Sequence, residues 1–205
     1  MHPEIFSDSQ QELLPFIAQF KRSFYLVGGT AIALYVGHRR SIDYDLFTFS
    51  RLNKIKIRQK IMQTPYKKNL IFEDHDQIHF NLNDVKLTFF NYPYPVEHLR
   101  KLDNIIPLPP LLSLAAMKAF ALGRRAKWKD YVDLYFIFKN FYTITEIVDE
   151  AKKIYGTLFS EKLFREQLAF HKDINYSEEI EYIIPNPPMD AEVKKELIRI
   201  ATNIY

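Results

Sequence analysis

The amino-acid sequence predicts a mixed α/β (α+β) fold in its first half and an all-helical second half. Short apolar, β-prone segments alternate with helical segments until about residue 92. Prolines then cluster within residues 107–110, which is typical of a linker, and only helical patterns follow. We therefore expect an α/β domain over residues 1–106 and a helical domain over residues 107–205.

Two strand–helix units are expected before the sheet is completed. The Gly28-Gly29 pair interrupts an apolar run, and Gly37 is suited to ending the helix that follows. In order, the expected elements are a helix over 9–21 containing Pro15, a strand over 24–27, a helix over 30–36, a strand over 42–49 and a basic helix over 51–63.

The region from about residue 69 to residue 92 is expected to be β-structure. Apolar and polar residues alternate over 78–82, Asn83-Asp84 is typical of a tight turn, and 86–90 supplies the partner strand. The second half then predicts five helices. They are expected over 111–122, 128–138, a segment that begins after the capping-box sequence Thr143 to Glu146, 160–170 and 191–205.

Composition limits the class of protein. The chain has 205 residues, 47% of them hydrophobic, and no cysteine, which excludes disulfides and thiolate metal sites. No signal-peptide layout and no membrane-spanning apolar run is present, so we expect a soluble, cytoplasmic protein that does not engage membranes. The net charge of +3 is too small to indicate a nucleic-acid partner. The basic clusters at 38–40, 51–60 and 124–129 are either solvated surfaces or parts of one anion-binding surface.

The segment Gly28-Gly29-Thr30 is suited to binding phosphate. Glycine lets the backbone approach an anion without a Cβ in the way, and the free N–H groups at a helix start favour negative charge. Thr30 adds a hydroxyl donor. Such turns are common, so this segment alone is a weak signal.

Asp43 and Asp45 make the signal stronger. Two residues apart on a strand, their carboxylates project from one face, where like charges are costly unless a cation joins them. Mg²⁺ or Mn²⁺ would satisfy both and would take its remaining ligands from nucleotide phosphates. The alternative is a strand end with both acids in solvent. Arg39, Arg40 and Ser41 are either phosphate or ribose contacts or a polar loop.

These residues resemble the opening motif of the polymerase-beta-like nucleotidyltransferase superfamily. The Gly-Gly-Thr of 28–30 and the Arg-Ser-Ile-Asp-Tyr-Asp-Leu of 40–46 are most similar to AbiEii/AbiGii-type toxin nucleotidyltransferases of bacterial toxin–antitoxin and abortive-infection systems. Downstream, 114–118 resembles the family's helix with a catalytic lysine, and 129–135 resembles its Asp-x-x-Asp-Leu-Tyr helix. The motifs together cover about residues 24–138.

The resemblance implies a mixed-sheet catalytic domain and a helical domain that close over an NTP with Mg²⁺. It implies that Gly28, Gly29, Thr30, Arg40 and Ser41 bind nucleotide, and that Lys118 contacts a nucleotide phosphate as a catalytic residue alongside Asp43 and Asp45.

Asp130 and Asp133 are included in the nucleotide site. They share one helix face, since they are three residues apart. There they would bind a metal-linked water, position Lys118, or pair with Arg124 and Arg125.

One position departs from the family pattern. A third carboxylate usually stands on a neighbouring strand, where it takes a proton from the attacking hydroxyl. Thr88 occupies the matching position in this sequence, and a hydroxyl is no base and a poor metal ligand. His75 and His79 have metal-ligand spacing only on a helix, so we expect them at the surface.

The sequence therefore predicts a nucleotidyltransferase that moves a nucleotide from an NTP to an acceptor hydroxyl on RNA, such as a tRNA 3′ end, or on a protein. It also predicts a toxin with a cognate antitoxin. The alternative is a catalytically weak or inactive nucleotide-binding module that acts mainly through a protein partner.

Overall fold

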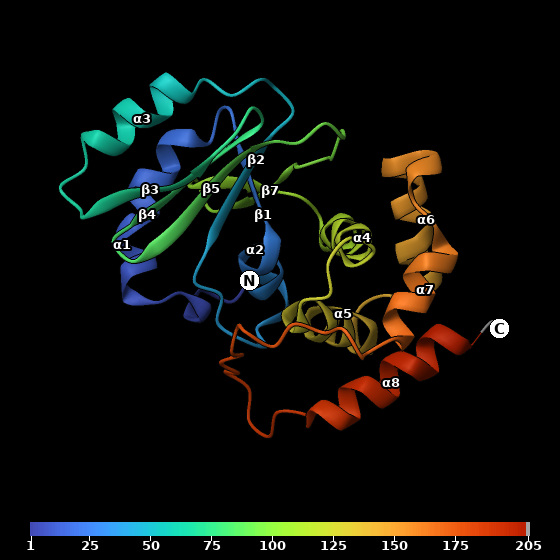
Figure 1. Ribbon diagram of the computed structural model, residues 1–205. Helices are drawn as coiled ribbons and strands as arrows, with labels where there is room; N and C mark the ends of the chain where they lie inside the picture. Colours follow the sequence, from blue (N-terminus) through green and yellow to red (C-terminus); the bar gives the residue numbers. More distant parts are fainter. Residues whose placement is uncertain (204–205) are drawn as a thin grey trace.

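A five-stranded mixed sheet forms the centre of the first half of the molecule (Figure 1). The computed structural model describes residues 1–203. The sheet order is β1-β2-β5-β4-β3, and β2 and β5 run parallel while the other neighbours are antiparallel. The strands are β1 (Tyr25–Val27), β2 (Tyr44–Thr48), β3 (Lys68–Glu73), β4 (Gln77–Leu82) and β5 (Val85–Asn91).

Helices cover both sides of this sheet. Figure 1 shows α3 on one side and α4, with the helices that follow it, on the other. The α-helices are α1 (Asp8–Ile17), α2 (Gly28–Val36), α3 (Lys54–Met62), α4 (Leu111–Leu122), α5 (Trp128–Asn140), α6 (Ile144–Tyr155), α7 (Glu161–Ala169) and α8 (Asp190–Thr202). In the chain up to residue 203, no helix combines the length and the apolar character needed to cross a membrane.

The mixed α/β architecture and the helical second half are confirmed. The β4–β5 turn places Asn83 and Asp84 at φ angles of 54° and 61°, the left-handed conformation that a two-residue hairpin turn needs. The capping box at α6 is also present, with Thr143 and Glu146 each bonded to the other's backbone N–H. The expected end of α8, at residues 203–205, lies partly outside the described residues.

The structure differs from the expected elements at two places. Helix α2 begins at Gly28 rather than Thr30, directly after the last residue of β1. The expected linker at 107–110 is partly a strand, because β7 (Ile106–Leu108) pairs with β6 (Arg100–Leu102) in a small hairpin. The sequence did not predict these strands because three residues are too few to show an alternating pattern. Pro107 is tolerated in β7 because the hairpin has only two strands, so the proline interrupts no central strand of a larger sheet.

The buried apolar residues of both halves form one contiguous cluster. On the α1 side of the sheet, Phe20 packs against Phe24 and Phe89 with ring centroids 5.8 Å and 4.9 Å apart. The division at residues 106/107 into two domains therefore stays a prediction.

The connection from α2 to β2 is fixed by one buried hydroxyl. Helix α2 ends at Gly37, whose φ of 69° is the left-handed conformation that glycine adopts readily. The chain then turns back, and the Thr30 hydroxyl donates to the carbonyl oxygen of Asp43 and lies 3.0 Å from Ser41 Oγ. Thr30 thereby ties the residues before β2 to the first turn of α2.

Replacing Thr30 with valine keeps the shape of the side chain and removes the hydroxyl. Because the Asp43 carbonyl loses a buried donor, we expect the free energy of unfolding to fall by about 1–2 kcal/mol. Urea denaturation measures this change. Thr30→Ser, which keeps the hydroxyl, is the control and should lose less. Equal stability of Thr30→Val and the unmodified protein would contradict the assignment.

Candidate nucleotide and metal site

The Asp45 carboxylate lies against the N-terminal turn of α2. The register of the sheet sets Asp45 opposite Val27, the last residue of β1. Gly28 follows with a φ of +73°, and a Cβ placed on it would lie 2.1 Å from Asp45 Oδ2. A Cβ on Gly29 would lie 2.7 Å from a guanidinium nitrogen of Arg39. Any side chain at these two positions would collide with Asp45 at Gly28 and with Arg39 at Gly29. The positive φ of Gly28 is a second reason for glycine there.

Asp43 and Asp45 form an acidic pair that has no direct ion-pair partner within residues 1–203, although the more distant charge of Lys86 lowers the pKa of both. Burial and the neighbouring charge of Asp45 raise the pKa of Asp43. Burial raises the pKa of Asp45, although a hydrogen bond from Thr88 partly offsets this shift. Within residues 1–203, no salt bridge reaches either carboxylate. Two partly buried, unmatched carboxylates are suited to a hard divalent cation.

Thr88 stands beside Asp45 on the next strand. β2 and β5 pair in parallel with Asp45 opposite Thr88, and Thr88 is buried. This is the position at which the family resemblance led us to expect a third carboxylate. In the described part of the chain, no cluster of three or more His, Asp or Glu residues is arranged to hold a metal ion. The group next to the acidic pair on β5 is therefore the Thr88 hydroxyl, where a third carboxylate was expected.

A cleft of about 530 Å³ opens beside Asp45. One part of it is polar and carries charge, with Gly28, Asp45, Thr88, Lys118 and Arg125 among its lining residues. Another part is aromatic. The aromatic lining residues are Phe47, Phe90, Tyr92, Tyr94 and Phe120. A polar end joined to an aromatic wall suits a ligand with a charged group at one end and a flat apolar ring at the other.

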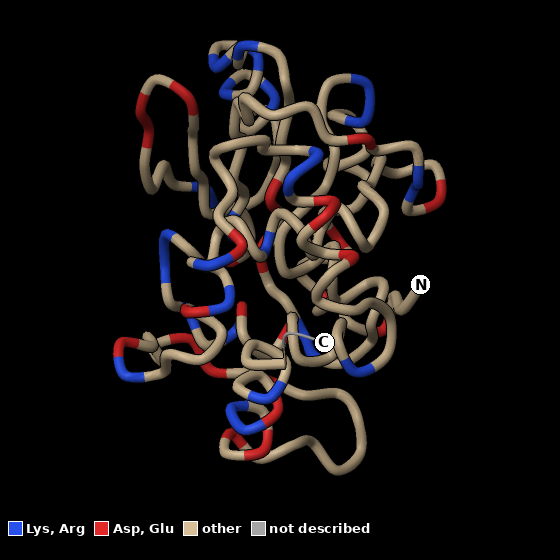
Figure 2. Tube along the Cα trace, turned by 90° about the vertical axis from the view of Figure 1, so that its right-hand side faces the viewer, with Lys and Arg blue, Asp and Glu red and all other residues tan. Residues whose placement is uncertain are grey.

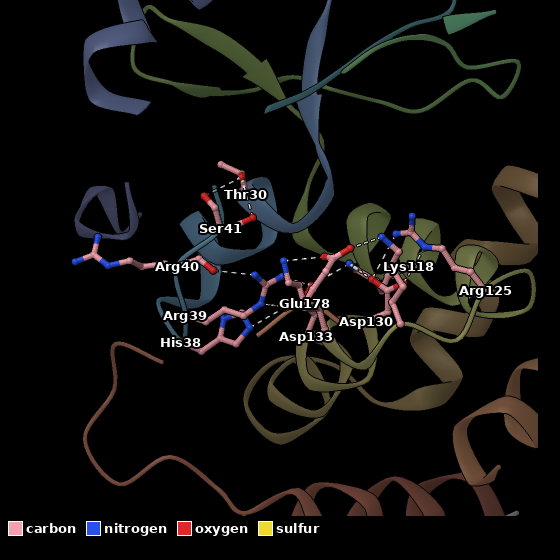
Figure 3. Close-up of polar contacts among 12 residues, drawn as sticks. Thr30, His38, Arg39, Arg40, Ser41, Lys118, Arg125, Asp130, Asp133 and Glu178 are labelled. Atoms are coloured by element: carbon pink, nitrogen blue, oxygen red, sulfur yellow. Dashed lines mark hydrogen bonds and ion pairs between the residues drawn. The ribbon is translucent and has the colours of Figure 1, made fainter. Parts of the chain in front are cut away.

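Lys118 reaches this cleft from α4. Its side chain is 6% exposed, and its Nζ lies 2.7 Å from Asp130 Oδ1 and 2.9 Å from Asp133 Oδ2 (Figure 3). Burial alone would lower the pKa of Lys118, but the charges of Asp130 and Asp133 outweigh it and raise the pKa. Lys118 therefore stays a cation at neutral pH while lining the site.

Asp133 joins the two halves of the protein through three cationic or hydrogen-bonding partners. Its side chain is fully buried and accepts bonds from Arg39 Nε at 2.7 Å and Arg39 Nη2 at 2.9 Å. His38 Nε2 lies 2.9 Å from the same carboxylate. Burial opposes ionisation of Asp133, but Arg39 and Lys118 hold its pKa well below the usual range. In this arrangement Asp133 positions Arg39 and Lys118.

Asp130 sits between Lys118 and the cleft-lining Arg125. Arg125 Nε donates to Asp130 Oδ2 at 3.0 Å. Arg124, another expected partner, instead lies over the Phe120 ring at 3.6 Å from its centroid. Asp130 is thus bonded to two cations that line the cleft.

The three polar residues before the acidic pair have different surroundings. Arg39 points inward to Asp133, whereas Arg40 points away from the cleft (Figure 3). Arg40 Nε donates to Glu181 Oε1 at 2.7 Å, and its guanidinium also reaches the carbonyl of Phe6. Ser41 is buried beside Gly29 and Thr30. The structure therefore does not bring Arg40 to the cleft, and neighbouring arginines in a sequence give no signal of which one turns inward.

The two histidines also separate. His75 is 79% exposed and pairs with Asp76, as expected for a surface residue. His79 instead lines the cleft and is hydrogen-bonded to Gln77. His75 lies in the turn before β4 and His79 lies on β4, so they do not form a pair.

With this geometry in place, comparison with known proteins identifies the class. The chain belongs to the family of the nucleotidyl transferase AbiEii toxin, type IV toxin–antitoxin system, whose family model matches residues 16–196. An uncharacterised protein of Aquifex aeolicus is 33% identical over 140 residues, covering 66% of this chain and 68% of that protein.

Solved structures share the fold. MenT4, a nucleotidyltransferase toxin from Mycobacterium tuberculosis, matches with a TM-score of 0.64 over 96% of this chain and 82% of its own, at 15% identity. JHP933 from Helicobacter pylori matches with a TM-score of 0.55 over 96% of this chain and 91% of its own, at 16% identity. The family and fold inferred from the motifs are confirmed.

The unmatched acidic pair should reduce stability. A carboxyl whose pKa is raised on folding favours the folded state when protonated, and that advantage is lost as the pH rises through the folded pKa. At pH 7, Asp43→Asn should therefore raise the free energy of unfolding by roughly 0.5–1 kcal/mol, or about 2 °C in Tm. Mg²⁺ should raise the Tm of the unmodified protein and not that of Asp43→Asn.

Thermal unfolding with and without Mg²⁺ measures both effects. The exposed Asp149→Asn, on α6, is the matched control and should change neither. A lower Tm for Asp43→Asn without Mg²⁺ would contradict an unmatched pair.

The ion pairs that Asp133 makes with Arg39 and Lys118 should determine how far the stability of the protein falls at low pH. Because the folded pKa of Asp133 is depressed, its contribution is fully present above the usual carboxyl value of 3.8 and is lost as pH falls below it. Asp133→Asn leaves buried cations underpaired, so we expect a loss of about 3–5 kcal/mol at pH 7 and a weaker pH dependence below pH 4. Urea unfolding from pH 2.5 to pH 7 tests both. If the free energy of unfolding of Asp133→Asn fell as steeply below pH 4 as that of the unmodified protein, Asp133 would not be the cause of the acid sensitivity.

Proposed function

We propose that this chain is a cytoplasmic toxin that transfers a nucleotide from an NTP to an acceptor hydroxyl of RNA. Its partners are Mg²⁺ or Mn²⁺, the NTP, the acceptor RNA and a cognate antitoxin. The single observation that supports this most strongly is the contact of the Asp45 carboxylate with Gly28 at the start of α2. In this proposal Asp45 is a metal ligand, and the contact supports it because the carboxylate lies beside backbone N–H groups that suit phosphate.

Each part of the cleft has a chemical role in this proposal. The N-terminal turn of α2 binds phosphate oxygens through backbone N–H groups. Lys118 and Arg125 neutralise the triphosphate, and Asp130 and Asp133 hold these cations in place. The aromatic wall of Phe90, Tyr92 and Tyr94 receives the flat nucleobase.

Asp43 and Asp45 fit a divalent metal, because both carboxylates are partly buried and unmatched. Such an ion supplies Lewis-acid stabilisation of charge on the phosphates. The chain itself aligns the reactants, so that the acceptor oxygen forms a bond to the α-phosphorus while the bond to pyrophosphate breaks. The hydroxyl proton passes to water.

A second function is favoured by Thr88. With a buried hydroxyl at the position opposite Asp45, the chain lacks a proton acceptor there. A nucleotide-binding module of low activity, acting mainly through a protein partner such as the antitoxin, would use the same pocket without turnover.

Label transfer separates these two functions. With α-³²P-labelled NTPs, Mg²⁺ and total RNA, we expect label in RNA, and we expect Asp45→Ala to lower the rate by at least about 10³-fold, since it removes charge stabilisation in the transition state. Asp149→Ala, an exposed acid on α6, is the control and should retain full activity. Mg²⁺-dependent NTP binding without label in RNA or protein would instead support the binding module.

A further inference from the structure

A second concave surface, of about 820 Å³, lies away from the cleft. It is formed by the segment 18–25, by residues 48–53 after β2 and by α3. We call it the basic groove. Its cationic lining residues are Lys21, Arg22, Arg51, Lys56 and Lys60, and His98 also lines it.

The charge of the basic groove is of one sign. No Asp or Glu is among its lining residues. Arg22, Arg51 and Lys56 are exposed, and within residues 1–203 no salt bridge involves any of the three. Lys and Arg are gathered at the top of the tube in Figure 2, at the height where Figure 1 places α3. Five cations around one hollow raise the local concentration of polyanions.

Aromatic rings are interleaved with these cations. Phe49 is 63% exposed at the groove, an unusual position for a large apolar ring. The exposed His98 ring stacks on Tyr25 at a centroid distance of 4.4 Å and an interplanar angle of 12°. Phe20 and Phe24 form the wall behind them. Cations that track a backbone, combined with rings on which bases stack, are the features of single-strand nucleic-acid sites.

The basic groove and the cleft have no lining residue in common. Phe47 lines the cleft and the next residue, Thr48, lines the groove. Successive residues of a strand point to opposite faces, so Phe47 and Thr48 face different sides of β2. Tyr25, which is in register with Phe47, lines the groove at the edge strand β1. A ligand in the groove therefore does not occupy the nucleotide cleft.

We propose that the basic groove binds a single-stranded segment of RNA through its phosphates and bases. An acidic protein partner would use the cations alone, whereas Phe49 and the stacked His98 add a preference for bases. The groove is a binding site for any such strand. Its role in holding the acceptor RNA rests on the proposed transfer reaction and predicts an effect on KM rather than on kcat.

The test uses a fluorescent U12 RNA and the full chain, with anisotropy measured from 50 to 300 mM salt. The variant R22Q/R51Q/K56Q should bind about 100-fold more weakly at 0.1 M salt, and the slope of log Kd against log salt should fall by about 2, because single strands lose about 0.7 per phosphate contact. Phe49→Ala should weaken binding about 5-fold or more with an unchanged slope.

The matched control removes three exposed lysines of the helical half, K162Q/K172Q/K195Q, and should keep both the affinity and the slope. Thermal unfolding checks that each variant folds. Unchanged U12 binding by R22Q/R51Q/K56Q would overturn the proposal. So would displacement of U12 by poly-glutamate together with no effect of Phe49→Ala, since that result identifies a surface for acidic protein.

Mg²⁺-NTP binding, measured on the same variants, should be unchanged. Absence of NTP binding or label transfer in all variants, with U12 binding still dependent on the groove, would contradict the proposed reaction and leave the groove assignment intact.

Discussion

The buried carboxylate of Asp133 is the interaction on which the arrangement of the site depends. It is fully buried, and it is charged only because Arg39 and Lys118 surround it. Arg39 belongs to the connection between α2 and β2, and Lys118 belongs to α4, so one carboxylate fixes both relative to α5. Removing one partner of such a buried cluster is costly because the remaining charges stay buried without compensation. The cleft between the sheet and α4 keeps its shape because this cluster is matched.

Two pairs of aspartates lie in this region, and they differ in whether cationic side chains bond directly to their carboxylates. Asp130 and Asp133 are matched by Lys118, Arg39 and Arg125, which makes them part of the framework. Asp43 and Asp45 are left unmatched, and burial raises the pKa of both. A folded protein that keeps two carboxylates in this condition gives up some stability, and in our proposal a divalent cation restores it. The contrast explains why four aspartates in similar motifs have different proposed roles.

Much of this could be predicted from local sequence. Glycine, capping residues and alternation are local signals, and they predicted the Gly28-Gly29 turn, the Asn83-Asp84 hairpin and the helix that Thr143 caps. The resemblance to the family implied that Lys118 belongs to the nucleotide site, and Lys118 lines the cleft beside Asp45. The rest depended on tertiary contacts. Arg39 and Arg40 are adjacent and alike in sequence, and only the position of α5 determines that Arg39 turns inward while Arg40 meets Glu181. The basic groove joins segments 18–25, 48–53 and α3, which no linear pattern connects.

The proposed function depends on a divalent cation held by Asp43 and Asp45 beside the first turn of α2. The most direct measurement is a crystal structure of the chain with Mn²⁺ and a non-hydrolysable NTP, with the metal located by its anomalous signal. We expect one Mn²⁺ bound to both carboxylates, with the phosphates at the Gly28-Gly29 turn and the base against Tyr92 and Tyr94. Nucleotide bound elsewhere, or Mn²⁺ absent from the two aspartates while nucleotide is bound, would contradict it.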